Sequence, residues 1–159
     1  LGDFCDFNTP LEKQLEYRQR LNGVIRLIRG NHDCIDEYPY PLFDTVHNEP
    51  EALHHIRQHL WLCHYPLQRN THYYTLCGHI HEHWRVQKRM LNVGVDVNDF
   101  TPLSMEDIMW AVNKEYNGDW DANVYPDANL AWKMHVSRKG RPGKDPTQQI
   151  LEKQLRETL

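Results

Sequence analysis

Apolar positions in the first part of the chain recur at the spacing of a helix. Leu11, Leu15 and Leu21 fall on one broad helical face, with polar residues between them. We expect the helix to begin after Thr9, which can serve as its N-cap, and to stop at Asn22-Gly23. An Asn-Gly pair readily adopts the left-handed backbone conformation that closes a helix.

Shorter apolar runs that end at turn-forming residues predict strands. They cover residues 24–28, 43–46 and 73–77, with two more strands between residues 84 and 97 around a turn at Gln87-Lys88. A capping box at Ser104–Asp107 then predicts a second helix that continues to about Tyr116. Together these elements indicate an α/β fold.

Residues 51–60 fit two interpretations. Leu53, Ile56 and Leu60 have helical spacing, whereas the apolar run from Leu60 to Cys63 is typical of a buried strand. The pattern alone leaves both open.

The composition changes after Gly118. Residues 1–118 carry a net charge of −5, whereas residues 119–159 carry +1. We expect the first range to be one domain and the second to be an appendage, with a solvated basic linker at Arg138–Lys144 and a terminal helix. The apolar stripe of that helix consists of Leu151, Leu155 and Leu159.

The overall composition excludes several classes of protein. The chain has 159 residues and a formal net charge of −4, which does not attract nucleic acid nonspecifically. No apolar run approaches the roughly 20 residues of a membrane helix, and no signal peptide opens the chain. The four cysteines form no C-x-x-C pair. We therefore expect a cytoplasmic protein with reduced cysteines and no membrane association.

Polar motifs follow four of the apolar, strand-like runs: Gly2-Asp3, Gly30–Asp33, Cys63–Pro66 and Gly78–His81. Ligands of α/β proteins bind outside the carboxyl ends of strands, so these motifs can converge on one site. They offer carboxylate, amide and imidazole groups, and eight of the 11 histidines lie between His54 and His83. This set of nitrogen and oxygen ligands suits Mn, Fe or Zn.

The order G-D, G-N-H-D, H-x-P, G-H-x-H resembles that of the calcineurin-like metallophosphoesterases. The stretch from G-H-I-H through L-N-V-G-V-D-V-N is similar to their small single-domain bacterial and phage branch. The resemblance covers residues 1 to about 116. It implies a four-layer α-β-β-α sandwich and a hydrolase, a phosphatase that cleaves a phosphate mono- or diester with a metal-bridging hydroxide.

The resemblance also implies a role for particular residues. Asp3 would bridge two divalent metals, and the first of these would be completed by Asn31, His64 and His79. His81 would belong to the second metal. The metals would be Mn, Fe or Zn, with manganese typical of such sites.

Two further residues would act on the substrate. By the resemblance, His32 would lie beside it as general acid or as a stabiliser of the phosphate, and Asp33 would orient His32. A histidine suits this task because its pKa lies near the working pH.

The chain departs from the family pattern at its start. The D-x-H motif that supplies the other ligands of the second metal is absent, and Leu1 stands directly before the first motif. We expect that a first strand carrying D-x-H is missing. Residues 1–159 alone should then bind one metal and hydrolyse aryl phosphates at least about 100-fold more slowly than a chain that carries the motif.

Other interpretations stay open. The fold can serve as a non-catalytic interaction module, and the same metals can serve a nuclease, which the acidic charge of residues 1–118 disfavours. Asn92 and Asp96 either support the metal ligands or face solvent. The cysteines are expected to pack strand ends rather than to sense redox state.

Overall fold

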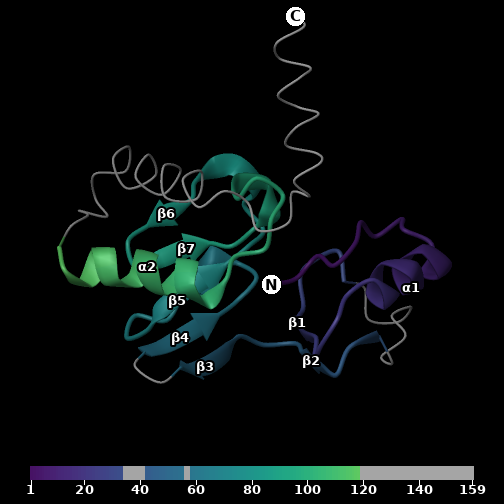
Figure 1. Cartoon of the computed structure of the whole chain (residues 1–159), viewed down its shortest axis with the longest axis horizontal. Helices are drawn as coiled ribbons and strands as arrows, with labels where there is room; N and C mark the ends of the chain where they lie inside the picture. The colour runs from purple at the N-terminus through teal and green to yellow at the C-terminus, as the bar shows by residue number, and fades with distance from the viewer. Residues whose placement is uncertain (34–41, 56–57, 119–159) are drawn as a thin grey trace, which may run out of the picture.

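The described part of the chain forms a mixed α/β fold, as the sequence predicts (Figure 1). The computed structural model describes residues 1–33, 42–55 and 58–118. The predicted appendage, with its basic linker and terminal helix, lies outside these residues. No helix within the described ranges is long and apolar enough to cross a membrane.

Two sheets hold the strands of the described residues. The first pairs β1 (Arg26–Ile28) in parallel with β2 (Thr45–His47). The second has the order β3-β4-β5-β7-β6. Its strands are β3 (Glu51–His55), β4 (Gln58–Leu62), β5 (Tyr74–Cys77), β6 (Val86–Gln87) and β7 (Met90–Asn92). Within it, β4, β5 and β7 run parallel, so their carboxyl ends lie at one edge.

Two strand predictions are corrected by the structure. The helical interpretation of residues 51–60 is wrong, because β3 and β4 are antiparallel partners and Leu53 lies directly opposite Leu60. The second strand of residues 84–97 ends at Asn92. The Asn92 side chain accepts a hydrogen bond from the Gly94 N–H at 2.9 Å, which turns the chain toward a short 3₁₀ helix.

The two helices differ in how well local signals predict their starts. Helix α2 (Met105–Tyr116) begins as expected, with the reciprocal bonds of a capping box between Ser104 and Asp107. Helix α1 (Leu11–Gln19) has Pro10 at its N-cap, so the prediction of Thr9 as N-cap is wrong. The Thr9 carbonyl instead accepts a hydrogen bond from the Gln14 side chain at 2.7 Å.

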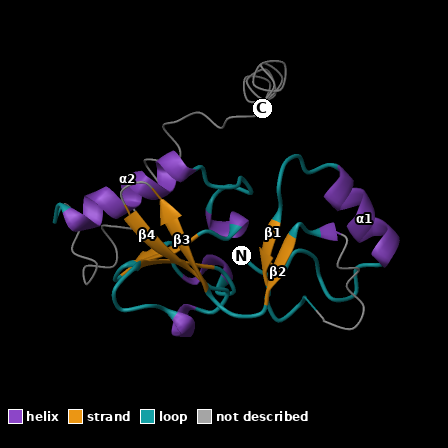
Figure 2. Ribbon diagram, turned by 90° about the horizontal axis from the view of Figure 1, so that it is seen from below, coloured by secondary structure: helices purple, strands orange, loops and turns teal. Residues whose placement is uncertain are grey.

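The two sheets have separate cores. Helix α2 covers the five-stranded sheet and buries Ile108, Ala111 and Val112 against it (Figure 2). Leu27, Leu42 and Phe43 form the smaller core beside β1 and β2. Helix α1 lies at that end and has no buried residue. The N-terminal segment runs between the two sheets (Figure 1), where motifs from both can meet.

Candidate metal centre

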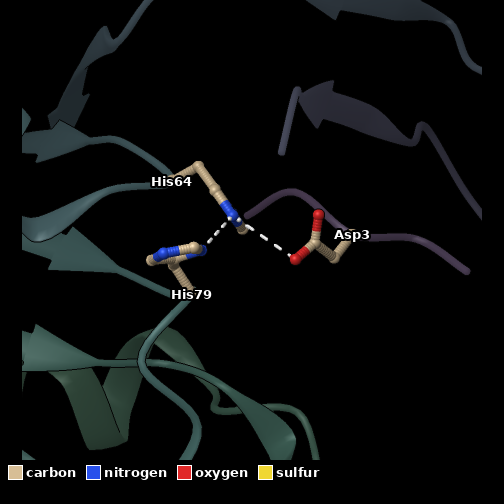
Figure 3. Close-up of side chains that lie close together, drawn as sticks. All are labelled: Asp3, His64 and His79. Atoms are coloured by element: carbon tan, nitrogen blue, oxygen red, sulfur yellow. Dashed lines mark hydrogen bonds and ion pairs between the residues drawn. The ribbon is translucent and has the colours of Figure 1, made fainter. Parts of the chain in front are cut away.

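Three of the predicted ligands meet between the sheets (Figure 3). His64 follows β4, His79 follows β5, and Asp3 belongs to the N-terminal segment. The Nε2 atom of His64 lies 3.4 Å from Asp3 Oδ2 and 3.1 Å from His79 Nδ1. One potential ligand atom of each residue lies within 4.8 Å of those of the other two. Residues 76 positions apart in sequence thus form one cluster.

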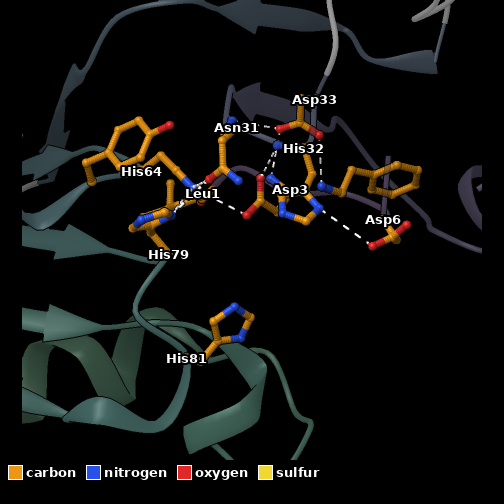
Figure 4. Close-up of polar contacts among 12 residues, drawn as sticks. Leu1, Asp3, Asp6, Asn31, His32, Asp33, His64, His79 and His81 are labelled. Atoms are coloured by element: carbon orange, nitrogen blue, oxygen red, sulfur yellow. Dashed lines mark hydrogen bonds and ion pairs between the residues drawn. The ribbon is translucent and has the colours of Figure 1, made fainter. Parts of the chain in front are cut away.

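The amide of Asn31 completes this group (Figure 4). Its Oδ1 atom lies 2.9 Å from His64 Nε2 and 2.9 Å from His79 Nδ1. The structure therefore brings together the four side chains that the resemblance assigned to one metal. We call them the ligand cluster: Asp3, Asn31, His64 and His79.

The orientation of His64 follows from its other ring nitrogen. His64 is 1% exposed, and its Nδ1 atom lies 2.9 Å from the carbonyl oxygen of Leu1. A carbonyl oxygen only accepts, so this contact is made by a protonated Nδ1, and Nε2 is the atom that would ligate a cation. Nε2 faces the oxygens of Asp3 and Asn31.

The ligand cluster fits a divalent cation. In a tetrahedral site with bonds of about 2.0–2.1 Å, neighbouring ligand atoms lie about 3.3 Å apart. The distances measured from His64 Nε2 are 2.9, 3.1 and 3.4 Å. One carboxylate, one amide oxygen and two imidazoles form a ligand set suited to Mn, Fe or Zn.

The surroundings of His79 favour the form that binds metal. Desolvation and the neighbouring His64 ring lower the pKa of His79 from its ordinary value. The ring of Tyr65 packs on both imidazoles, with centroids 4.5 Å from His79 and 4.7 Å from His64. An imidazole must be neutral to ligate a cation, so the lowered pKa favours binding near pH 7.

The backbone takes an unusual conformation at three predicted ligands. Asp3, His79 and His81 have φ angles of 52°, 68° and 44°, in the left-handed region that non-glycine residues rarely occupy. Such residues persist where the surrounding structure holds them, and they gather at functional sites. All three residues line the same cavity.

Two glycines allow the close approach of the backbone segments. A Cβ atom on Gly30 would lie 2.7 Å from the Asp3 nitrogen and 2.7 Å from His64 Cε1. A Cβ atom on Gly2 would lie 2.7 Å from the Gly30 backbone. Neither position has room for a side chain, because the ligand cluster surrounds both.

Gly30→Ala should therefore weaken metal binding. We expect the metal affinity to fall by about 10–100-fold, the range seen when groups that support a ligand are lost, and the chain to lose about 1–3 kcal/mol of stability. Calorimetric titration with Mn²⁺ and thermal unfolding measure the two effects. Gly23→Ala is the control for metal affinity, because nothing lies within 4 Å of its Cβ position; its φ of 87° is strained for alanine, so this variant should lose stability but keep its metal affinity. Unchanged affinity in Gly30→Ala would contradict this account.

Asp33 supports the backbone of the cluster. It is 2% exposed, and its carboxylate accepts hydrogen bonds from the backbone N–H groups of Asp3, Phe4 and Gly30 at 2.8, 3.0 and 2.8 Å. These bonds hold the Gly2-Asp3 turn against the loop that carries Asn31. The role predicted for Asp33 is to orient the His32 side chain. The three hydrogen bonds named above hold backbone N–H groups of other residues.

The carboxylate beside the His32 ring is Asp6, which the sequence analysis missed. Its Oδ2 atom lies 3.7 Å from His32 Nδ1, and the ring of Phe7 packs on the imidazole with centroids 5.4 Å apart. The backbone N–H of His32 donates a hydrogen bond to Asp3 Oδ1 at 2.8 Å, which fixes His32 next to the ligand cluster. No local motif marks Asp6, because its contact spans 26 positions.

His81 lies apart from the ligand cluster (Figure 4). Its Nδ1 atom is 2.7 Å from Asp96 Oδ2, and with Glu82 these residues form a second group whose ligand atoms lie within 4.8 Å of one another. Asn92 is buried and donates to the carbonyl oxygens of His81 and Trp84 at 2.7 and 2.9 Å. The sequence left open whether Asn92 and Asp96 support the metal ligands or face solvent. In the structure, Asp96 contacts the His81 side chain, and Asn92 binds backbone carbonyls of the loop that carries His81.

One cavity connects the two groups. It measures about 340 Å³, and its lining includes Asp3, His64, His79, His81 and Asp96. A substrate in this space could contact both sets of side chains.

The two cysteines beside these ligands are packing residues. Cys63 and Cys77 are fully buried at the ends of β4 and β5. Burial raises the pKa of Cys63 to about 11 and that of Cys77 further still. A protonated, buried thiol is unreactive, in agreement with the expectation from the sequence.

Comparison with known proteins shows a similar fold, and the similar proteins have no assigned activity. No family model matches the chain. An uncharacterized protein of Methanocaldococcus jannaschii is 28% identical over 122 residues, which are 72% of this chain and 64% of that protein. A protein of unknown function from Aquifex aeolicus, solved by crystallography, is similar with a TM-score of 0.53 and 24% identity. That match covers 69% of this chain and 73% of the solved one, and it shows the fold alone.

Proposed function

We propose that this chain is part of a metal-dependent phosphoesterase that hydrolyses a phosphate mono- or diester. The observation that carries the proposal is the convergence of Asp3, Asn31, His64 and His79 on one point. These residues come from three strand ends and the N-terminal segment, in the order typical of calcineurin-like metallophosphoesterases. We also propose that α2, the two sheets and α1 are the four layers of the α-β-β-α sandwich of that family.

Different side chains would bind the cation and transfer the proton in such a reaction. The ligand cluster would hold a divalent cation (Mn, Fe or Zn), which when bound neutralises phosphoryl charge and lowers the pKa of a coordinated water. His32 is held at the cluster through its backbone, and its ring lies outside the four converging groups. An imidazole beside the carboxylate of Asp6 can hold a proton and pass it to the leaving alkoxide.

A second cation would use the other group. His81 and Asp96 offer an imidazole and a carboxylate on the wall of the same cavity. We propose two metals in a protein that also carries D-x-H, and one in residues 1–159.

The proposal predicts metal-dependent hydrolysis. After removal of metal with EDTA and titration with Mn²⁺ or Zn²⁺, elemental analysis should find about one metal per chain. Hydrolysis of p-nitrophenyl phosphate, a monoester, and of bis(p-nitrophenyl) phosphate, a diester, should require the metal. The ester that is hydrolysed faster identifies the protein as a monoesterase or a diesterase. The same assay on a chain with a D-x-H segment joined before Leu1 should show a higher rate.

Two results would decide against the proposal. A chain that takes up no metal from excess Mn²⁺ or Zn²⁺ has no metal centre. A chain that binds metal but cleaves neither ester, even with D-x-H supplied, would favour the non-catalytic interaction module.

A further inference from the structure

Two histidine side chains face each other across the edge hairpin of the five-stranded sheet. His54 of β3 lies directly opposite His59 of β4, and the Nδ1 atoms of the two rings are 2.7 Å apart. Strand β3 is the edge strand of that sheet (Figure 1). The metal centre proposed above uses neither residue.

Both rings lie on the sheet face opposite α2. Their neighbours Leu53 and Leu60 pack in the core that α2 covers, and successive side chains of a strand point to opposite faces. His54 and His59 are accordingly exposed to solvent. A dissolved ion can therefore reach them.

The pair is also well separated from the ligand cluster. His59 is the second residue of β4, whereas His64 follows the end of that strand. A strand rises about 3.3 Å per residue, so the three steps from His59 to Leu62 alone span roughly 10 Å. The pair is a distinct site and does not depend on the proposed function.

The backbone and a neighbouring ring position the two imidazoles. The antiparallel pairing of β3 and β4 fixes the register, and the centroids of the two rings lie 4.7 Å apart. The ring of Tyr73 packs on His59 with centroids 5.6 Å apart. Side chains that are already held in this way lose less conformational entropy when they bind a ligand.

The hydrogen bond between the rings leaves both nitrogens available to a cation. In the neutral pair, one Nδ1 donates its hydrogen to the lone pair of the other. When the donor ring takes its other neutral tautomer, with the proton on Nε2, both Nδ1 lone pairs face the same space. One cation can then replace the shared hydrogen without a change in the number of protons bound.

The separation of the two nitrogens indicates the kind of cation. With metal–nitrogen bonds of about 2.0–2.1 Å, two ligands at a right angle lie about 2.9 Å apart, and two at the tetrahedral angle about 3.3 Å apart. The distance of 2.7 Å between the Nδ1 atoms is closer to the first value. Nitrogen ligands at right angles are typical of Cu²⁺ and Ni²⁺, whereas Zn²⁺ prefers a tetrahedron.

We propose that His54 and His59 form a cross-strand site for a divalent transition metal ion of this class, Cu²⁺ or Ni²⁺. The two imidazoles occupy adjacent coordination positions, and water fills the positions that face solvent. Among the described residues, β4 is the only strand that pairs with β3. The bound ion therefore adds a second attachment of the edge strand to the sheet and stabilises the folded chain.

Equilibrium dialysis of the full chain against Ni²⁺, followed by elemental analysis, tests the proposal. His54→Gln and His59→Gln should each bind one nickel fewer per chain than the unchanged protein. We expect the affinity of this site to fall at least about tenfold, because a lone imidazole lacks the second, intramolecular contact. The difference is expected whether or not the ligand cluster takes up nickel. An unchanged nickel content in both variants would overturn the proposal.

His72→Gln is the matched control. His72 is also an exposed histidine, and it lies in the loop before β5, outside the hairpin. This variant should bind as much nickel as the unchanged chain. An equal loss of nickel in His72→Gln would show that the ion binds exposed histidines without regard to their geometry, which would also overturn the site.

Metal selectivity and thermal unfolding test the geometry of the site. The nickel that is lost in His54→Gln should be displaced by Cu²⁺ more readily than by Zn²⁺. Without metal, His54→Gln should unfold at nearly the same temperature as the unchanged chain, since the ring is exposed. Ni²⁺ should then raise the Tm of the unchanged chain more than that of the variant. Tighter binding of Zn²⁺ than of Ni²⁺, or an equal rise in Tm, would contradict an ion held at right angles between β3 and β4.

Discussion

His64→Ala should remove the metal from the candidate centre and bring hydrolysis down to the level of EDTA-treated protein. His64 Nε2 lies 2.9, 3.1 and 3.4 Å from atoms of Asn31, His79 and Asp3, the other three members of the ligand cluster. Groups that only support a ligand are worth about 10–100-fold in metal affinity, so we expect the loss of a ligand itself to exceed about 100-fold. Elemental analysis after dialysis measures it.

Two further variants make the result specific. His83→Ala removes an exposed imidazole near the second group, and its metal content should match that of the unchanged chain. His64 is buried, so its loss can also reduce stability; Asn31→Ala removes an exposed ligand and should lose metal with little change in unfolding temperature. Full metal content in both His64→Ala and Asn31→Ala would contradict the assignment of the ligand cluster.

His32→Ala should lower kcat by about 10²–10⁴-fold while the metal content stays the same. The reason is that the backbone of His32 contacts the ligand cluster, whereas its ring lies beside Asp6. Its backbone N–H, which donates to Asp3 Oδ1, survives the substitution, whereas the imidazole beside Asp6 is lost. The measurement compares kcat and bound metal in a chain with D-x-H joined before Leu1.

The choice of leaving group separates the two roles considered for His32. A general acid matters most for a poor leaving group, so the loss should be larger with phenyl phosphate than with p-nitrophenyl phosphate. An equal loss with both esters would instead identify a stabiliser of the phosphate. A parallel loss of metal would make His32 a ligand and refute the prediction.

Short-range signals in the sequence were sufficient for several elements. The capping box of Ser104 and Asp107 predicts the start of α2, because both of its hydrogen bonds are made within one turn. The apolar run before Gly78 likewise predicts β5 to within one residue. For residues 51–60 the apolar pattern was ambiguous. These residues form strands only by pairing with each other, with Leu53 opposite Leu60, and the local spacing does not show that pairing.

The order of the motifs in the sequence, through its resemblance to the metallophosphoesterases, predicted which side chains gather at the ligand cluster. For His64 and His79 the physical reason is local, since they follow the parallel strands β4 and β5, which end at one edge of a sheet. Only the tertiary structure decided what surrounds them. The positions of Asp6 beside His32 and of Asp96 beside His81, and the backbone contacts of Asp33, all depend on how distant segments pack. A second cavity, lined by Tyr74, Arg89, Glu115 and Tyr116, joins residues up to 42 positions apart. Such contacts are set by long-range packing, for which local spacing carries no information.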